Sequence, residues 1–325
     1  MPDGRLEGEF LGREGMRLIF LGTPNFAVPT LERTVKAGHQ VLTVITQPDR
    51  PRGRGQHPAP PPVKEAALRL GLPIFQPERV RRPEAVEHLR ALAPEAMVVV
   101  GYGQIIPQTI IDLAPLGIIN VHASLLPKYR GAGPIQWAII NGETRTGVTT
   151  MRIDAGLDTG DMLLKEETEI GPDETAIELG QRLATMGADL LVKTLDGLAR
   201  GTIRPEPQNS AEATHAPLLK KEDGAIDWTQ PAASVHNRVR GLQPWPGAST
   251  TFRGQALHIW RSRALAERGA APGHFATLKP PVVGCGEGSL ELVEVQMEGR
   301  KRMPAADFVN GQRLTENDKL GETVR

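Results

Sequence analysis

An amide and an imidazole lie two residues apart near the end of an apolar run, in residues 118–127 (Ile-Ile-Asn-Val-His-Ala-Ser-Leu-Leu-Pro). In a strand this spacing puts Asn120 and His122 on one face. Two polar side chains on one face of an apolar strand are costly to bury unless they have partners or a use. Taken singly, each is better explained as a buried side chain satisfied by its neighbours. As a pair, an amide donor beside a base that titrates near neutral pH suits carbonyl chemistry.

Three carboxylates follow in a Gly-rich loop, Asp154, Asp158 and Asp161. Their spacing does not match the order of ligands in an EF-hand, so calcium binding is not indicated. Side-chain turn formation is the simpler explanation for Asp154 and Asp161. One of the three remains a candidate functional acid.

Residues 47–62 are rich in Pro and Gly and carry Arg50, Arg52 and Arg54 against a single acid, Asp49. Composition alone favours a solvated linker. The position directly after a predicted strand, and the length of the segment, favour a functional loop instead. Alternating arginines suit contact with phosphates, so both interpretations stay open.

The elements that must position these residues alternate between strand and helix from Met16 onward. The predicted strands cover residues 17–22, 39–46, 72–75, 96–101, 118–126, 146–153 and 162–170. The predicted helices cover a segment with Pro29 in its first turn and Gly38 at its end, and residues 65–70, 83–92, 134–141 and 173–198. This order predicts an α/β fold with a doubly wound, mostly parallel, Rossmann-like sheet. Ligands of such sheets bind at the carboxyl ends of the strands, where Asn120 and His122 lie. The turn after the first strand lacks the dinucleotide-binding spacing.

Residues 203–224 lack apolar periodicity and read as a linker between domains. Beyond them come a helix at 232–240 and five short alternating runs, at 248–252, 256–260, 274–278, 281–285 and 290–295. These predict a C-terminal OB-like β-barrel. The expected domains are therefore a disordered extension (1–15), a domain that carries the candidate pair (16–202), the linker (203–224) and a barrel (225–325) that could also hold nucleic acid.

The composition of the chain limits the partners, metal sites and cellular settings that can be expected. The 38 basic residues balance 38 acidic ones, so a polyanion must be met by local patches. The single cysteine excludes an internal disulfide and a cysteine-built metal site, which fits a reducing, cytoplasmic setting. No run approaches the roughly twenty apolar residues of a membrane span, and the first residues lack the apolar core of a secretory signal.

Three motifs together resemble those of the 10-formyltetrahydrofolate-dependent formyltransferases: residues 120–127, residues 128–136 (Lys-Tyr-Arg-Gly-Ala-Gly-Pro-Ile-Gln) and residues 156–161 (Gly-Leu-Asp-Thr-Gly-Asp). From Met16 the chain is similar to the branch of this family that formylates methionyl initiator tRNA, including the Thr-Gln-Pro-Asp-Arg run at 46–50. Ala123 stands where the family usually has Gly. Residues 50–62 also depart from the family, with His57 and three prolines in place of further basic residues.

The resemblance implies a set of site residues. It implies catalysis by Asn120, His122 and Asp158. It implies folate binding by the turn Ser124, Leu125, Leu126 and Pro127. It also implies contact with the acceptor end of the tRNA by Arg50, Arg52 and Arg54. By the same resemblance residues 16–202 are the catalytic domain and the barrel at 225–325 binds tRNA.

The implied reaction moves the formyl group of 10-formyltetrahydrofolate to the α-amino group of methionyl initiator tRNA, for translation initiation. Asn120 would donate to the oxyanion of the tetrahedral intermediate, His122 would donate to it or move the proton, and Asp158 would orient the imidazole. The chemistry requires no metal, and nothing in the sequence demands more than a monomer. Alternatives are a glycinamide ribonucleotide or sugar-nucleotide formyltransferase, a formyltetrahydrofolate hydrolase, and a catalytically silent tRNA-binding protein.

Overall fold

The computed structural model describes residues 15–52, 57–267, 269–315 and 317–322. Residues 1–14 of the predicted extension, and Arg54, lie outside the described residues. The chain divides into two compact units. The N-terminal unit contains the chain up to Gly131, Gly147–Thr168 and Gly180–His215, and the C-terminal unit contains Ala132–Thr146, Glu169–Leu179 and the chain from Ala216.

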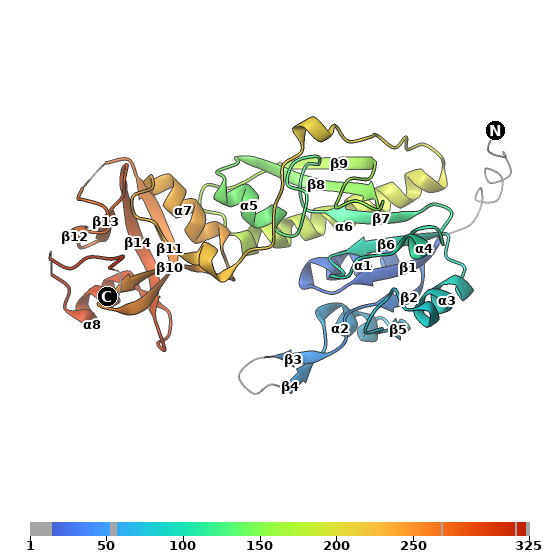
Figure 1. The fold of residues 1–325 in the computed structure, drawn as a ribbon, viewed down its shortest axis with the longest axis horizontal. Helices are drawn as coiled ribbons and strands as arrows, with labels where there is room; N and C mark the ends of the chain where they lie inside the picture. Colours follow the sequence, from blue (N-terminus) through green and yellow to red (C-terminus); the bar gives the residue numbers. More distant parts are fainter. Residues whose placement is uncertain (1–14, 53–56, 268, 316, 323–325) are drawn as a thin grey trace. The chain divides into compact units, whose positions relative to one another are not determined.

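The N-terminal unit is built on a seven-stranded sheet with the order β5-β2-β1-β6-β7-β8-β9 (Figure 1). The strands from β5 to β7 are parallel, and β8 is antiparallel to β7. The predicted doubly wound, mostly parallel α/β fold is therefore confirmed. The strands are β1 (Arg17–Gly22), β2 (Gln40–Ile45), β5 (Ile74–Phe75), β6 (Ala96–Val100), β7 (Ile118–His122), β8 (Arg145–Arg152) and β9 (Met162–Glu169).

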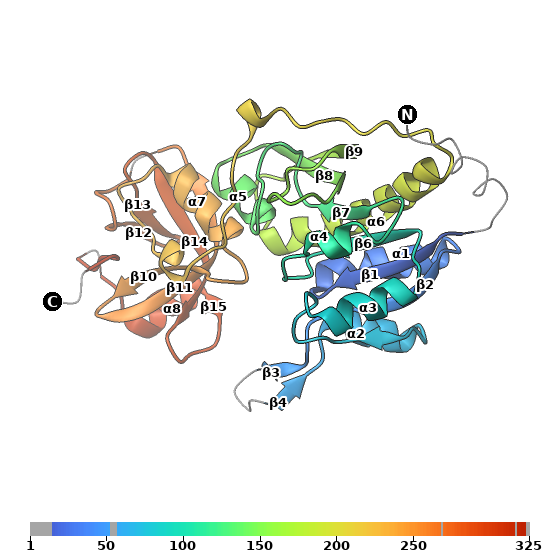
Figure 2. The same ribbon diagram turned by 45° about the vertical axis from the view of Figure 1, so that its right-hand side comes forward.

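Helices cover both faces of this sheet (Figure 2). They are α1 (Val28–Lys36), α2 (Pro62–Arg69), α3 (Pro83–Ala91), α4 (Gln108–Ile111) and α6 (Ala176–Ala199). On one face, Leu89 of α3 and Ile110 of α4 share an apolar cluster with Met97 of β6. On the other face, α1 and α6 are joined by an ion pair between Arg33 and Asp189, at 2.6 Å. Among the described residues, none of these helices combines the length and apolar character that a membrane crossing requires.

Strand β7 positions the candidate pair because alternate residues face opposite sides of the sheet. Val121, which lies between the two members of the pair, faces α6, where Gly187 comes so near that a Cβ there would lie 2.7 Å from Val121 Cγ1. Asn120 and His122 therefore face away from α6. The strand ends at His122, earlier than the predicted residue 126, because the chain bends at Ser124, whose hydroxyl donates to the Lys128 carbonyl at 2.6 Å.

Residues 47–62, expected as an open loop, contain an antiparallel ribbon. Its strands are β3 (Arg50–Arg52) and β4 (His57–Ala59), with Arg50 opposite Ala59 and Arg52 opposite His57. The ribbon projects from the N-terminal unit in both views (Figures 1 and 2). Sequence periodicity could not indicate it, because a proline occupies the middle of each three-residue strand.

The C-terminal unit is an antiparallel sheet with the order β10-β11-β14-β13-β12, and β15 pairs with β14. The predicted C-terminal β domain is confirmed as an antiparallel sheet, with the helix expected at 232–240 and all five predicted strands present, and the structure adds β15 and α8. The strands are β10 (Ala248–Phe252), β11 (Gln255–Leu265), β12 (Phe275–Leu278), β13 (Pro281–Gly284), β14 (Ser289–Met297) and β15 (Met303–Pro304). The helices are α5 (Pro134–Ile140), α7 (Ala232–Gly241) and α8 (Ala305–Gln312).

One apolar core holds this unit together. Phe252 of β10 meets Phe308 of α8 edge to face, with ring centres 5.1 Å apart. Helix α5 belongs here although it lies within residues 16–202, because it packs closely on α7: a Cβ at Gly241 would lie 2.8 Å from Ile140 Cγ1. The second unit is therefore assembled from separate stretches of chain.

Candidate active site

Asn120, His122 and Asp158 come together at the carboxyl end of β7. The Asn120 amide donates to Asp158 Oδ1 at 3.4 Å, and His122 Nδ1 lies 3.6 Å from Asp158 Oδ2. The side chains of Asn120 and His122 are buried, and that of Asp158 is 17% exposed. The structure thus brings Asn120 and His122, which strand spacing nominated, together with Asp158, which the family resemblance implied, although Asp158 follows His122 only after another helix and strand.

The hydrogen bonds of His122 assign different roles to its two ring nitrogens. Nε2 lies 2.9 Å from the Tyr129 carbonyl oxygen. Because a carbonyl only accepts, Nε2 carries a hydrogen and donates it. Nδ1, facing the Asp158 carboxylate, is the nitrogen left to take up or release a proton. A carboxylate in this position can supply the countercharge for an imidazolium.

Asp158 connects the other parts of the site. Besides facing Asn120 and His122, its Oδ2 accepts from the backbone N–H of Gly131 at 2.9 Å. Its backbone has φ of +52°, in the left-handed region that a non-glycine residue adopts at some cost in conformational energy. Gly160 permits the tight loop that follows, since a Cβ there would lie 2.0 Å from the Arg152 carbonyl oxygen. The loop therefore holds the carboxylate in a defined place.

The structure adds a residue that sequence reasoning missed. Gln208, inside the predicted linker, donates through Nε2 to the carbonyls of Asp158 and Gly160, both at 2.8 Å. Its Oε1 accepts two bonds from the buried Arg130 guanidinium, at 2.9 and 2.7 Å. Gln208 thereby fixes the backbone that carries Asp158. A single glutamine in a polar stretch gave no signal of this role.

The turn at 124–127 is held by its own serine and by side chains of β8 and β9. The Ser124 hydroxyl is used internally, and Leu126 is buried against Met151 and Met162. Thr149 Oγ1 donates to the Ser124 carbonyl at 2.7 Å and accepts from Leu126 N–H at 3.1 Å. Leu125 and Pro127 keep part of their surface exposed. They are the members of this turn that can offer contact area to a ligand.

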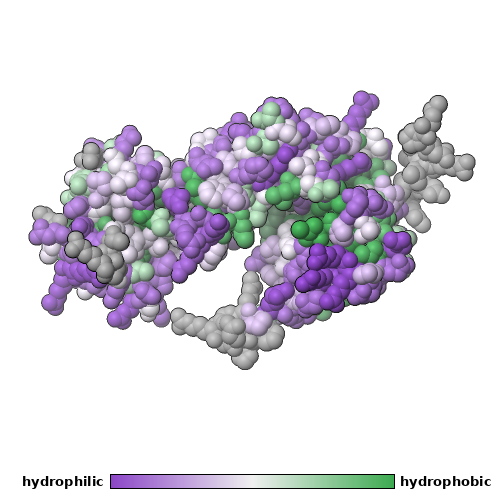
Figure 3. Space-filling model, in the orientation of Figure 1, coloured by the Kyte–Doolittle hydropathy of each residue, from purple (hydrophilic) through white to green (hydrophobic). Residues whose placement is uncertain are grey.

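Two large apolar side chains are exposed beside the carboxyl ends of the strands. Ile105, in the segment after β6, is 90% exposed, and Leu157, directly before Asp158, is 65% exposed. Apolar surface also interrupts the hydrophilic face of this unit in the space-filling view (Figure 3). Exposed apolar side chains near convergent polar groups are typical of a small-molecule site.

The remaining predicted residues have separate places. Asp154 forms a turn, accepting from Gly156 N–H at 3.0 Å and from the Thr159 hydroxyl at 2.7 Å, as expected. Arg50 is exposed on the ribbon. Within the described ranges, no group of three or more His, Cys, Asp and Glu side chains could hold a metal ion.

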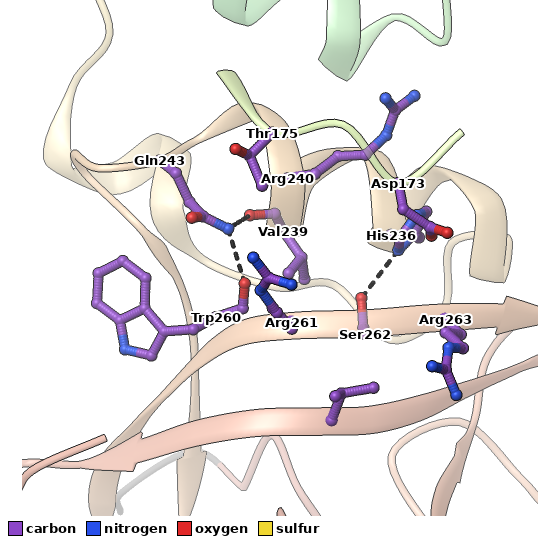
Figure 4. Close-up of a pocket in the computed structure, with 11 residues that line it drawn as sticks. Asp173, Thr175, His236, Val239, Arg240, Gln243, Trp260, Arg261, Ser262 and Arg263 are labelled. Carbon is purple, nitrogen blue, oxygen red and sulfur yellow. Dashed lines mark hydrogen bonds and ion pairs between the residues drawn. The ribbon is translucent and has the colours of Figure 1, made fainter. Parts of the chain in front are cut away.

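A cavity of about 130 Å³ in the C-terminal unit lies between α7 and β11 (Figure 4). Its buried polar residues have protein partners. His236 contacts the Ser262 hydroxyl at 3.0 Å and the Pro172 carbonyl at 3.2 Å. Arg240 donates to the carbonyls of Gly171 and Glu174. These contacts tie the stretch before α6 to α7, which is a structural role.

Fold and site together define an enzyme that transfers a carbonyl-containing group: an amide donor, an imidazole and a shared carboxylate lie at the ligand-binding edge of a parallel sheet. The comparisons with known proteins agree. The family described as formyl transferase matches residues 16–195, and its C-terminal domain matches residues 218–313.

Two bacterial relatives show to which branch of the family the chain is similar. The methionyl-tRNA formyltransferase of Solibacter usitatus is 75% identical over 308 residues, covering 94% of this chain and 99% of that protein. The methionyl-tRNA formyltransferase of Koribacter versatilis is 57% identical over 317 residues, covering 94% and 99%. The chain belongs to the formyl transferase family, within its methionyl-tRNA formyltransferase branch.

More distant solved structures share the fold. The sugar 3N-formyl transferase WlaRD has a TM-score of 0.65 at 19% identity, covering 89% of this chain and all of that one. HypX from Aquifex aeolicus, in complex with tetrahydrofolic acid, has a TM-score of 0.64 at 17% identity, covering 96% of this chain and 51% of that one.

Proposed function

We propose that the enzyme transfers the formyl group of 10-formyltetrahydrofolate to the α-amino group of methionyl initiator tRNA, and that Asn120, His122 and Asp158 carry out the transfer. The observation that carries this proposal is one carboxylate facing both an amide donor and an imidazole whose Nδ1 is left for proton transfer. Close relatives named methionyl-tRNA formyltransferase support the choice of acceptor.

The neutral amine attacks the formyl carbon, forming a C–N bond and a tetrahedral intermediate with an oxyanion. The Asn120 amide has two N–H groups; one is directed at Asp158, and the other can donate to this oxygen. One such donor is worth roughly 3 kcal/mol in the barrier. An α-amino group has a reference pKa of about 7.7–8, so a useful fraction is neutral at cellular pH.

His122 moves the proton. Nδ1 takes the proton that the amine nitrogen loses, and Asp158 stabilises the imidazolium. The intermediate collapses by breaking the bond between the formyl carbon and N10 of the folate. The proton passes to that leaving nitrogen, so the formyl group and the proton exchange places. His122 is neutral again at the end of the cycle.

The folate and tRNA contacts are also part of the proposal. Exposed apolar surface for the flat ring system of the folate comes from Leu125, Pro127, Ile105 and Leu157. Ser124 and Leu126 stabilise the conformation of the turn. Arg50 and Arg52 of β3, together with Arg54, which lies outside the described residues, would contact phosphates at the acceptor end of the tRNA.

A single-turnover assay tests the reaction. The enzyme is mixed with 10-formyltetrahydrofolate and methionyl initiator tRNA, with uncharged tRNA, water alone and an amino-sugar nucleotide as alternative acceptors. We expect formyl-methionyl-tRNA to form far faster than product appears with any other acceptor. Release of tetrahydrofolate without formylated tRNA would indicate a hydrolase instead. Faster transfer to the sugar nucleotide would overturn the proposed acceptor.

A further inference from the structure

Three glutamines tie together the segments that follow three strands of the sheet. Gln47 follows β2, Gln76 follows β5, and Gln104 lies beyond the end of β6. Gln76 Nε2 donates to the Gln47 carbonyl at 2.9 Å, and Gln104 Nε2 lies 3.4 Å from Gln47 Oε1. Gln47 Nε2 in turn donates to the Tyr102 carbonyl at 3.1 Å. These bonds make a continuous support at the carboxyl edge of the sheet.

The β3–β4 ribbon begins at Arg50, shortly after Gln47. Asp49 attaches the start of the ribbon to the neighbouring segments. Gln76 Nε2 donates to Asp49 Oδ1 at 2.8 Å as well as to Gln47. Lys64 Nζ, on α2, donates to Asp49 Oδ2 at 2.7 Å. These two hydrogen bonds, that from Gln76 the larger, hold the pKa of Asp49 below its ordinary value, so the carboxylate stays charged. Both of its oxygens are therefore held, one by the sheet edge and one by a helix.

We propose that Asp49, Gln76 and Lys64 form a clamp that sets the direction of the β3–β4 ribbon, and that they are positioning residues for the tRNA acceptor. This inference rests on the proposed function, since it concerns how the arginine-bearing ribbon meets the tRNA. A two-stranded ribbon of three residues a strand is not stable alone, so its direction depends on its attachment.

Asp49 is an acidic residue beside Arg50 and Arg52. The direction in which its removal changes tRNA binding therefore tests the proposal. If Asp49 acted only through its charge, it would repel tRNA phosphates, and its removal would strengthen tRNA binding. If Asp49 is part of a clamp, its removal frees the ribbon, which must then be ordered on binding, and tRNA binding weakens. The two accounts therefore predict changes of opposite direction.

The experiment compares Asp49→Ala, Asp49→Asn and Gln76→Ala in the full-length enzyme. For Asp49→Ala we expect KM for methionyl-tRNA to rise roughly tenfold, with kcat at saturating tRNA and KM for the formyl donor nearly unchanged. Asp49→Asn keeps an oxygen that can accept from Gln76 and loses the ion pair, so its effect should be smaller. Gln76→Ala should resemble Asp49→Ala.

Gln108→Ala is the matched control, because Gln108 also donates to an exposed aspartate, Asp112, at 2.7 Å within α4. It should leave all constants unchanged. Backbone amide exchange of Arg50, Arg52, His57 and Ala59, the ribbon residues that carry an N–H, gives a readout that does not depend on the reaction. Faster exchange in Asp49→Ala and Gln76→Ala supports the clamp.

The outcomes separate the two proposals. Unchanged exchange, or a lower KM for tRNA in both Asp49 variants, would overturn the clamp. Faster exchange with unchanged KM would instead show that the ribbon does not contact the tRNA, which overturns that part of the proposed function and leaves the attachment intact. Failure of the wild-type enzyme to formylate methionyl-tRNA would overturn the proposed function directly.

Discussion

Two buried histidines of this chain each lie beside an aspartate, one in each compact unit. His122 Nδ1 is 3.6 Å from Asp158, and His236 Nε2 is 3.3 Å from Asp173. By distance and burial of the imidazole the pairs are nearly alike. They differ in their carboxylates, since Asp158 is 17% exposed and Asp173 is 74% exposed.

The partners of each pair explain the difference in role. Both ring nitrogens of His236 are taken up by fixed protein atoms, the Ser262 hydroxyl and the Pro172 carbonyl. His122 has one nitrogen fixed by a carbonyl and the other facing a carboxylate that also contacts an amide donor. A buried histidine beside an aspartate is therefore not enough to mark a site. The distinguishing feature is a ring nitrogen that faces a carboxylate shared with an amide donor, the arrangement to which the proposed mechanism assigns proton transfer and oxyanion stabilisation.

The largest effect is expected for Asn120→Ala, which removes the oxyanion donor from the His122–Asp158 pair. Turnover should fall roughly 10²- to 10³-fold, while methionyl-tRNA binding stays nearly unchanged because Asn120 acts on the transition state. Single-turnover formyl transfer and tRNA binding, measured on the same preparation, check both parts. Unchanged turnover would refute the role assigned to this amide.

A smaller effect is expected for Gln208→Ala, which loosens the loop carrying Asp158 without touching the three proposed catalytic side chains. We expect kcat to fall about tenfold, since misplacement of a catalytic group lowers the rate steeply. Thermal unfolding serves as the control for general damage. A loss of stability without any change in kcat would mean that Gln208 supports the fold and not the position of Asp158.

The smallest effect is expected for His236→Gln and concerns the pH dependence of the free energy of unfolding. Burial lowers the pKa of His236 from its ordinary value of 6.5, so the unfolded chain binds its proton more tightly. The free energy of unfolding should therefore fall as the pH drops below about 6.5, and the fall should level off below the folded pKa. In His236→Gln the fall in the free energy of unfolding should be smaller. Urea unfolding between pH 7.5 and 5 measures it.

Formyl transfer at pH 7.5 should change less than twofold in His236→Gln, since the proposal gives His236 a structural role. A large loss of turnover in a variant that remains folded would remove the distinction between the two histidines. An unaltered pH dependence of unfolding would show that His236 does not titrate between the two states.

The sequence was most informative where one local pattern decides the structure. Strands β1 and β10 were predicted with their observed bounds, because each is a short apolar or alternating run between turn residues. Asn120 and His122 could be nominated from strand spacing alone. Asp158 could not be chosen among three loop carboxylates from the residues themselves, and the family resemblance selected it.

Features that depend on distant contacts were not predictable. The ribbon at 50–59 has prolines at its centre, and its attachment depends on Gln76 and Lys64 from other elements. The role of Gln208 depends on a polar segment that returns to the loop around Asp158. The placement of α5 in the C-terminal unit depends on its packing against α7. In each case the deciding contact joins residues far apart in the chain.

The most direct test replaces the carboxylate of each histidine pair by an amide, in Asp158→Asn and Asp173→Asn, and measures single-turnover formyl transfer to methionyl-tRNA. We expect at least about a hundredfold loss for Asp158→Asn, because the imidazolium of His122 loses its countercharge, and less than a twofold change for Asp173→Asn. Unfolding measurements on both variants establish that they are folded. Equal rates in the two variants would contradict the assignment of catalysis to Asn120, His122 and Asp158.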